Sequence, residues 1–233
     1  ATKPRHPSRE AHMEEATPLG PGGPSPRDSR AALTRRARHL TRRYRGTFSP
    51  ETIASYLEEC HDFLAARAAI TAYLPILAER LATERLDALA RTTGHVPKTA
   101  PDVLFVCTEN SGRSQLATAL LRHRAPKAVR VHSAGTLPSA TIDPMALRLL
   151  TEVGLGPDNE FPKPLTHEVV RAADVVVSLG CGDACPVLPG RRYYDWNLPD
   201  LKGLDIESAR SVRDTLAGRI EQLATEISNR TVA

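Results

Sequence analysis

The sequence predicts an α/β fold in which a small three-helix N-terminal domain precedes a doubly wound, four-stranded parallel sheet. Two patterns indicate this fold. In residues 31–89, apolar side chains recur with a period of about 3.6, which is typical of amphipathic helices. After residue 101, short apolar runs alternate with helical patterns, as they do where parallel strands are joined by crossover helices.

The N-terminal part of the chain divides into a tail and a helical bundle. Residues 1–30 are rich in proline and glycine and poor in large apolar side chains, so we expect a disordered tail there. Residues 31–92 are expected to form the three helices. The first ends near Gly46, and the second opens with Ser49 as its N-cap and Pro50 at its first helical position.

A linker, residues 92–101, leads into the α/β domain of residues 101–233. The strands of this domain are expected at residues 103–106, 129–132 and 175–179 and around Tyr193. Its helices are expected at residues 115–123, 144–153, 166–172 and 206–227. Because parallel strands end at one edge of a sheet, we expect ligands to bind at their C-terminal ends.

The composition excludes several classes of protein. Of the 233 residues, 41% are hydrophobic and 25% are charged, and no apolar run approaches the 18 or so residues that a membrane span needs, about 30 Å of helix. Aromatic residues make up 4%, which argues against the stacking platforms of single-strand nucleic-acid binders. Four cysteines in a chain of this size suit a reducing compartment, and no secretory leader pattern is found, so we expect a cytoplasmic protein.

The first helix concentrates the positive charge of the chain. Residues 31–46 contain six arginines and no acid. We interpret them as a solvated or acid-paired helix face, since acids in the next two helices offer partners, and we do not expect nucleic-acid binding. A homodimer through the helical domain is a further hypothesis. The eight histidines are scattered without metal-ligand spacing, so no bound metal is expected, and Cys60 lies on an apolar stripe as a core residue.

The segment that indicates chemistry is Cys107, five intervening residues and Arg113, placed between an apolar strand and a helix. The backbone N–H groups of such a loop converge at a helix N-terminus and cradle a tetrahedral oxyanion. The positive end of the helix favours the nucleophilic thiolate of Cys107, and the planar fork of Arg113 grips two anion oxygens. The residues expected to bind the oxyanion are Thr108, Glu109, Asn110, Ser111, Gly112, Arg113 and Ser114.

Two motifs in this region resemble the low-molecular-weight protein tyrosine phosphatase family. They are VLFVCTENSGRSQLA at residues 103–117 and VHSAG at residues 131–135. The similarity is closer to the arsenate reductase branch of that family, of the thioredoxin-coupled type with an N-terminal helical extension. It covers about residues 101–228 and includes LGCGDACPVLPG at 179–190 and DWNLPDLKG at 195–203.

The resemblance implies a set of roles. Arsenate, or a similar oxyanion such as phosphate, is held in the loop and attacked by Cys107. Ser114 supports the thiolate, and Asn110 together with Ser133 braces the loop. Asp200 matches the aspartate with which the family protonates a leaving oxygen, although Leu201 stands where the family usually has proline.

A second pair of thiols, Cys181 and Cys185, favours the reductase branch. They follow the strand expected at residues 175–179, at the edge where the Cys107 loop also emerges, so they are expected to reach Cys107. The resemblance implies that one of them attacks the cysteine–arsenic adduct, arsenite leaves, and a Cys181–Cys185 disulfide is then reduced by thioredoxin or a small thiol. The family usually separates these cysteines by six residues rather than three, so the order of attack stays open. No cofactor is expected to be bound.

Two other enzymes fit parts of this pattern. A low-molecular-weight protein tyrosine phosphatase needs Cys107, Arg113 and Asp200 but neither late cysteine. A mycothiol-coupled arsenate transferase passes the adduct to a small thiol and needs one protein cysteine. A third alternative is not enzymatic: the helical region binds a partner and the loop senses an oxyanion.

Overall fold

The computed structural model describes residues 26–68, 71–158, 160–181 and 187–231. The N-terminal domain consists of α1 (Pro26–Arg43), α2 (Pro50–Ala65) and α3 (Leu74–Thr92). Ser49 caps α2 as predicted, since its hydroxyl oxygen accepts a hydrogen bond from the backbone N–H of Thr52. The helices bury a common core that includes Leu40, Ile53, Leu57, Leu81 and Leu86.

Helix α1 begins earlier than the sequence analysis placed it. Residues 26–30 were expected in a disordered tail, but they form the first turns of α1. Pro26 suits the first turn of a helix because that turn needs no N–H donor from it, and Asp28 complements the positive helix end. The rest of the expected tail, residues 1–25, lies outside the described residues.

The second part of the chain alternates strands and helices as predicted. The elements are β1 (Asp102–Cys107), α4 (Arg113–Arg124), β2 (Arg130–Gly135), α5 (Pro144–Glu152), α6 (His167–Ala172), β3 (Val175–Ser178), β4 (Arg192–Asp195) and α7 (Ile206–Thr231). The four strands pair in parallel in the order β2-β1-β3-β4. The prediction of a four-stranded parallel sheet is confirmed, and β2 extends beyond its predicted end because residues 133–135 continue to pair with β1.

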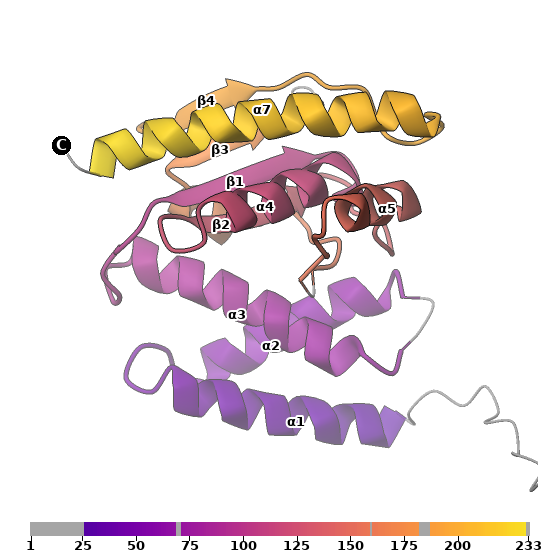
Figure 1. The fold of residues 1–233 in the computed structure, drawn as a ribbon. Coiled ribbons are helices and arrows are strands. Elements are labelled where there is room, and N and C mark those ends of the chain that lie inside the picture. Colours follow the sequence, from indigo (N-terminus) through magenta and orange to yellow (C-terminus); the bar gives the residue numbers. More distant parts are fainter. Residues whose placement is uncertain (1–25, 69–70, 159, 182–186, 232–233) are drawn as a thin grey trace, which may run out of the picture.

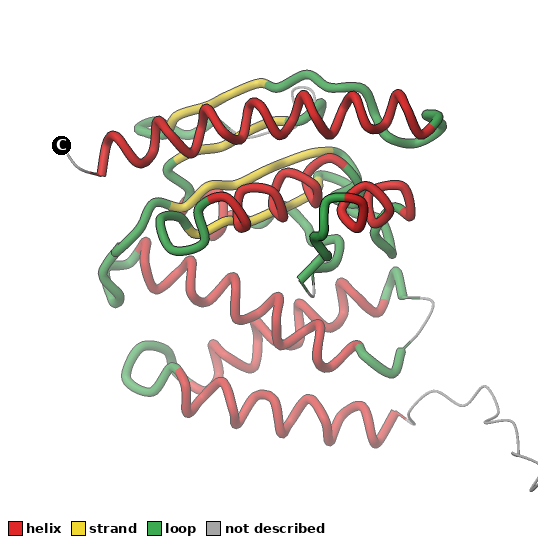
Figure 2. The backbone as a smooth tube through the Cα atoms, viewed as in Figure 1, coloured by secondary structure: helices red, strands yellow, loops and turns green. Residues whose placement is uncertain are grey.

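Helices cover both faces of the sheet, and Figures 1 and 2 show α4 and α7 along one of them. Helices α4, α5 and α7 pack on the face formed by alternate residues of β1 such as Val103 and Phe105. The opposite face, with Leu104 and Val106, packs against α6 and also against Ala88 of α3. Helix α3 therefore belongs to two cores: one of its faces completes the bundle and another contacts the sheet domain through α6.

Candidate active site

The loop between β1 and α4 folds around the thiol of Cys107. Cys107 is the last residue of β1 and is buried. Its Sγ atom accepts a hydrogen bond from the backbone N–H of Asn110 at 3.2 Å and lies 3.0 Å from Ser114 Oγ. Hydrogen bonds of this kind stabilise a thiolate more than a thiol, because they are stronger to an ionised acceptor. The loop is therefore built to hold Cys107 as a nucleophile.

Asn110 is the structural centre of the loop. It is fully buried and adopts a φ of 50°, a left-handed conformation that asparagine tolerates better than most residues. Its Nδ2 donates to Ser114 Oγ at 2.8 Å, which leaves the hydroxyl hydrogen of Ser114 available to Cys107. Its Oδ1 accepts from the backbone N–H of Lys163 at 2.7 Å, and its carbonyl accepts from Gln115 Nε2 at 2.8 Å.

Ser133 was expected to brace the Cys107 loop together with Asn110, but its hydroxyl bonds to another segment. The Ser133 hydroxyl donates to Glu160 Oε2 at 3.3 Å. Asn110 is held instead by Gln115 and Lys163, which the sequence analysis did not single out. Gln115 lies in the first turn of α4, inside the motif at residues 103–117. Lys163 gave no signal, because it lies in an irregular segment 53 positions along the chain from Asn110.

Arg113 begins α4 and extends its guanidinium along the loop. Its side chain is buried; Nη1 donates to the carbonyl of Leu198 at 3.0 Å, and Nη2 donates to Asp200 at 2.7 Å. Gly180, at a φ of 85°, lies against this guanidinium, since a Cβ there would stand 2.5 Å from Nη1. The structure thus brings together Cys107, Arg113 and Asp200, three of the predicted catalytic residues.

Asp200 lies at the exposed rim of the site. Its side chain is 58% exposed, so a substrate can reach its carboxylate, which also accepts from the backbone N–H of Lys202 at 3.1 Å. The following residue, Leu201, is buried against Gly112 of the loop, within 3.3 Å of the position a Cβ would take. The leucine thus holds the Asp200 segment against the Cys107 loop.

The outer loop residues carry polar side chains that bond to one another. Glu109 accepts hydrogen bonds from the hydroxyls of Ser111 and Ser139, so its carboxylate does not face the thiol as an anion ligand, and its contribution to an oxyanion would be its backbone N–H. Thr108 donates its hydroxyl to the carbonyl of Gly180 at 3.4 Å. This bond joins the Cys107 loop to the loop that follows β3.

Cys181 follows Gly180 directly and is buried. The N–H of Leu179 donates to the carbonyl of Val106. The two segments are therefore bonded side by side one residue before Cys107 and two residues before Cys181. The predicted neighbourhood of these two loops is therefore present. Cys185 lies outside the described residues, and so does the rest of residues 182–186.

A buried charge cluster lies behind the loop, between α3 and the sheet. It consists of Glu84, Asp102, His132, Glu160 and Lys163. Burial opposes ionisation of Glu84, but Lys163 and His132 outweigh it and hold the pKa of this carboxyl below its ordinary value. Burial also opposes the charge of Lys163 and of His132, yet their carboxylate partners raise the pKa of both. Burial opposes ionisation of Asp102 and Glu160 as well, but neighbouring cations lower the pKa of both carboxyls, so all five groups are stabilised in their charged forms.

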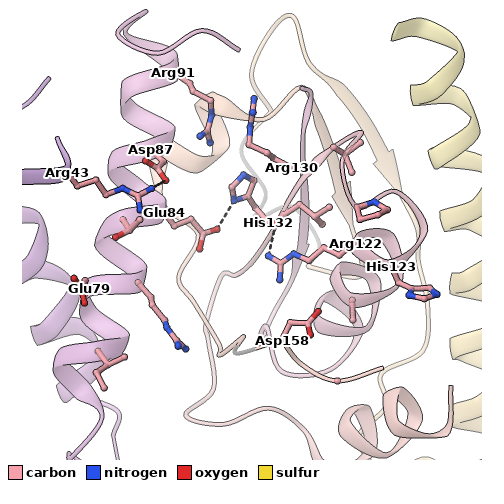
Figure 3. Close-up of a pocket in the computed structure, with 18 of the residues that line it drawn as sticks. Arg43, Glu79, Glu84, Asp87, Arg91, Arg122, His123, Arg130, His132 and Asp158 are labelled. Atoms are coloured by element: carbon pink, nitrogen blue, oxygen red, sulfur yellow. Dashed lines mark hydrogen bonds and ion pairs between the residues drawn. The ribbon is translucent and has the colours of Figure 1, made fainter. Parts of the chain in front are cut away.

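A cavity of about 1070 Å³ opens beside this cluster, between the bundle and the edge of the sheet (Figure 3). Helices α1 and α3 form one wall, and α4 and β2 form the other. Its arginines are largely neutralised by acids of the protein: Arg36 by Glu79 and Arg43 by Asp87. None of the predicted site residues that the structure describes lines it. A smaller cavity of about 360 Å³ lies at the outer side of the Cys107 loop, lined in part by Glu109, Ser111 and Lys202.

The part of the chain that the structure describes shows neither a metal site nor a membrane-spanning helix. No group of three or more histidine, cysteine or acidic side chains there is arranged to hold a metal ion. Among the described helices, none combines the length and apolar character needed to cross a membrane.

The low molecular weight phosphotyrosine protein phosphatase family matches residues 102–233. The chain belongs to this family. A separate match, to a protein-tyrosine-phosphatase-like N-terminal domain, covers residues 33–90. Both parts of the predicted fold are thereby confirmed, and so is the resemblance on which the sequence analysis relied.

Several known relatives are named as arsenate reductases. A solved thioredoxin-dependent arsenate reductase from Corynebacterium glutamicum is 45% identical, covers 86% of this chain and 98% of its own, and superposes with a TM-score of 0.78. A glutaredoxin arsenate reductase from Synechocystis sp. is 34% identical over 129 residues, which are 54% of this chain and 98% of the relative. An arsenate reductase from Staphylococcus epidermidis is 32% identical over 129 residues, or 54% of this chain and 96% of the relative.

Proposed function

We propose that this member of the phosphatase family reduces arsenate to arsenite, with Cys107 as the nucleophile and thiols of the loop after β3 as the reductant. The observation that carries the proposal is the pairing of two thiol-bearing loops: Cys107 in an anion-cradling loop, and Cys181 in a loop bonded to it through Thr108. A phosphatase has no use for the second thiol. The relatives named arsenate reductase support the same choice.

The first step forms a sulfur–arsenic bond. The Cys107 thiolate attacks As(V), and one arsenate oxygen leaves as water after accepting protons, one of them from Asp200. Arg113 holds the remaining oxygens. Its Nη2 donates to Asp200, and an incoming oxyanion competes for that donor and so releases Asp200 to act as the acid.

The second step transfers electrons to arsenic. A thiolate of the second loop attacks Cys107 Sγ, the electron pair of the S–As bond passes to arsenic, and As(III) leaves as arsenite. The remaining late thiol then attacks the mixed disulfide, which frees Cys107 and leaves a Cys181–Cys185 disulfide. The position of Cys181 beside the Cys107 loop favours it as the first attacker, with Cys185 as the second.

We further propose thioredoxin as the donor that reduces this disulfide. The Corynebacterium relative, described as thioredoxin-dependent, supports this choice, whereas the Synechocystis relative is named for glutaredoxin. Glutaredoxin, and the small thiol named above as an alternative, are the competing donors to test. The proposal also includes a cytoplasmic location, because the relay starts from reduced thiols.

The test is arsenate-dependent oxidation of NADPH with thioredoxin and thioredoxin reductase. The protein is compared with its Cys107→Ser, Cys181→Ser and Cys185→Ser variants, and Cys60→Ser is the matched control because Cys60 is buried in the bundle core. Loss of activity in the first three, with the control unchanged, supports the relay. Activity that survives loss of Cys185 but needs an added small thiol would favour the transferase. If the protein hydrolyses an aryl phosphate, Cys181→Ser does not change that rate, and arsenate is not turned over, the result would favour a phosphatase and contradict the proposal.

A further inference from the structure

The segment formed by residues 160–165, here called the bracing segment, lies between the helical bundle and the Cys107 loop. Toward the loop, the backbone N–H of Lys163 donates to Asn110 Oδ1, and the carbonyl of Phe161 accepts from Gln115 Nε2 at 3.3 Å. The Lys163 carbonyl also accepts from the N–H of Gly135 at the end of β2. Toward the bundle, the ring of Phe161 packs against the core of α1–α3. One short segment thus contacts both domains.

An ion pair fixes the bracing segment to the bundle. Lys163 Nζ lies 2.8 Å from Glu84 Oε2 and 2.8 Å from Glu160 Oε2, and the lysine side chain is 4% exposed. A buried ammonium is costly unless carboxylates surround it. Glu160 belongs to the segment itself, whereas Glu84 comes from α3. Figure 3 shows Glu84 extending from α3 toward His132, whose Nδ1 lies 2.8 Å from Glu84 Oε1.

The contacts continue from Lys163 to the nucleophile. Asn110, held by Lys163, donates to Ser114, and both Asn110 N–H and Ser114 Oγ contact Cys107 Sγ. Gly135, which pairs with the bracing segment, also lies close against Asn110, since a Cβ on Gly135 would lie 2.9 Å from the Cβ of Asn110. A shift of the bracing segment would therefore displace two groups that contact the thiol.

We propose that Glu84 and Lys163 are positioning residues for Cys107, through which the helical domain sets the geometry of the catalytic loop. The inference rests on the proposed function in that Cys107 is the nucleophile, but it concerns the reactivity of the thiol and not the identity of the substrate. Neutralising Glu84 leaves Lys163 with one carboxylate, loosens the bracing segment, and weakens the donors that Asn110 and Ser114 offer to the thiolate.

Glu84→Gln is the variant that tests this proposal, and Glu168→Gln is its matched control. Arg85 and Glu168 form another ion pair between α3 and the sheet domain, with Nη2 and Oε1 3.0 Å apart and similar burial, but neither is bonded to Asn110. The readout is the rate at which iodoacetamide alkylates Cys107, followed by mass spectrometry of its peptide between about pH 5 and pH 9. This readout needs no arsenate, so it stays informative if the reductase proposal fails.

Alkylation in Glu84→Gln is expected to slow by about fivefold to tenfold at low pH, with the midpoint of its pH profile shifted upward, while Glu168→Gln stays within about twofold of the wild type. Equal effects in the two variants, or an unchanged profile in Glu84→Gln, would overturn the proposal. Should Glu84→Gln fold poorly, the double variant Glu84→Gln/Lys163→Met removes both charges of the pair and avoids an underpaired ammonium. It is expected to regain stability but to keep the slow alkylation, and a wild-type rate in it would equally overturn the proposal.

Discussion

Gly180→Ala is the substitution that best isolates the role of Arg113 in anion binding. A methyl group at this position would lie 2.5 Å from Arg113 Nη1, which is bonded to the carbonyl of Leu198, while Nη2 is bonded to Asp200. The guanidinium is buried, and a shift of Nη1 away from the methyl group disturbs the hydrogen bonds that the two nitrogens make. The substitution is therefore expected to displace the fork from the position in which it meets an oxyanion.

The size of the effect follows from two contributions. Alanine at a φ of 85° costs about 1–2 kcal/mol of stability, whatever the space around it. Gly190 has a φ of 78° with no atom within 4 Å of its added Cβ, so Gly190→Ala carries the same backbone cost without the clash. The difference between the two variants is the displaced guanidinium, and a misplaced hydrogen bond to an anion weakens binding by about 10- to 100-fold.

The assay is protection of Cys107 from iodoacetamide by phosphate, measured as the concentration that halves the alkylation rate. This reports anion binding without involving Cys181, which is adjacent to Gly180. The value of kcat/KM for arsenate in the thioredoxin-coupled assay is expected to fall by a similar factor. Equal protection constants in Gly180→Ala and Gly190→Ala would refute the reasoning, because the clash would then have no bearing on the anion.

Three further predictions concern the acid, the bundle and the buried histidine. Asp200→Asn should lower arsenate turnover by about 100-fold or more, because a general acid contributes on that order, and an unchanged kcat would remove Asp200 from the first step. Leu57→Ala, in the bundle core, should lower the free energy of unfolding by about 2–5 kcal/mol. The fluorescence of Trp196, in the sheet domain, follows the urea transition of that domain. If both domains unfold together, this transition shifts to lower urea in the variant, whereas independent domains would leave it in place. His132→Gln should lower Tm by about 2–6 °C near pH 6, and by less at a pH above the raised pKa of His132 in the folded protein. The protonated histidine stabilises the fold below its unfolded pKa of about 6.5, and this contribution is lost as the pH rises through the folded pKa. A pH-independent difference in Tm would contradict this account of His132.

The sequence predicted those features that depend on neighbouring residues. The apolar run that ends at Cys107 and the helix that begins at Arg113 gave the loop, because strand and helix periodicity change within a few residues there. The cap at Ser49 was equally local. The start of α1 at Pro26 was missed because proline-rich composition outweighed the suitability of proline for a first helical turn.

The features that the sequence did not predict depend on contacts between distant segments. Lys163 lies outside any periodic element, and nothing in its neighbours indicates that its N–H bonds to Asn110 or that its ammonium is buried. Glu84 resembles any polar position on an amphipathic helix. It becomes distinctive once α3 is placed against the sheet, because its carboxylate then lies between Lys163 and His132. Pairings of this kind have no spacing rule that a single sequence could reveal.

The dual packing of α3 explains why the stability of the sheet domain depends on the bundle. Arg91 of α3 lies 3.1 Å from the fully buried Asp102 of β1, and Ala88 of α3 packs on the same sheet face as Leu104 and Val106. Without α3, Asp102 and Lys163 would each lose a buried partner of opposite charge, which leaves buried charges underpaired. The sheet domain of this chain therefore holds buried charges whose partners come from α3. We infer that the bundle is an integral part of the folded enzyme.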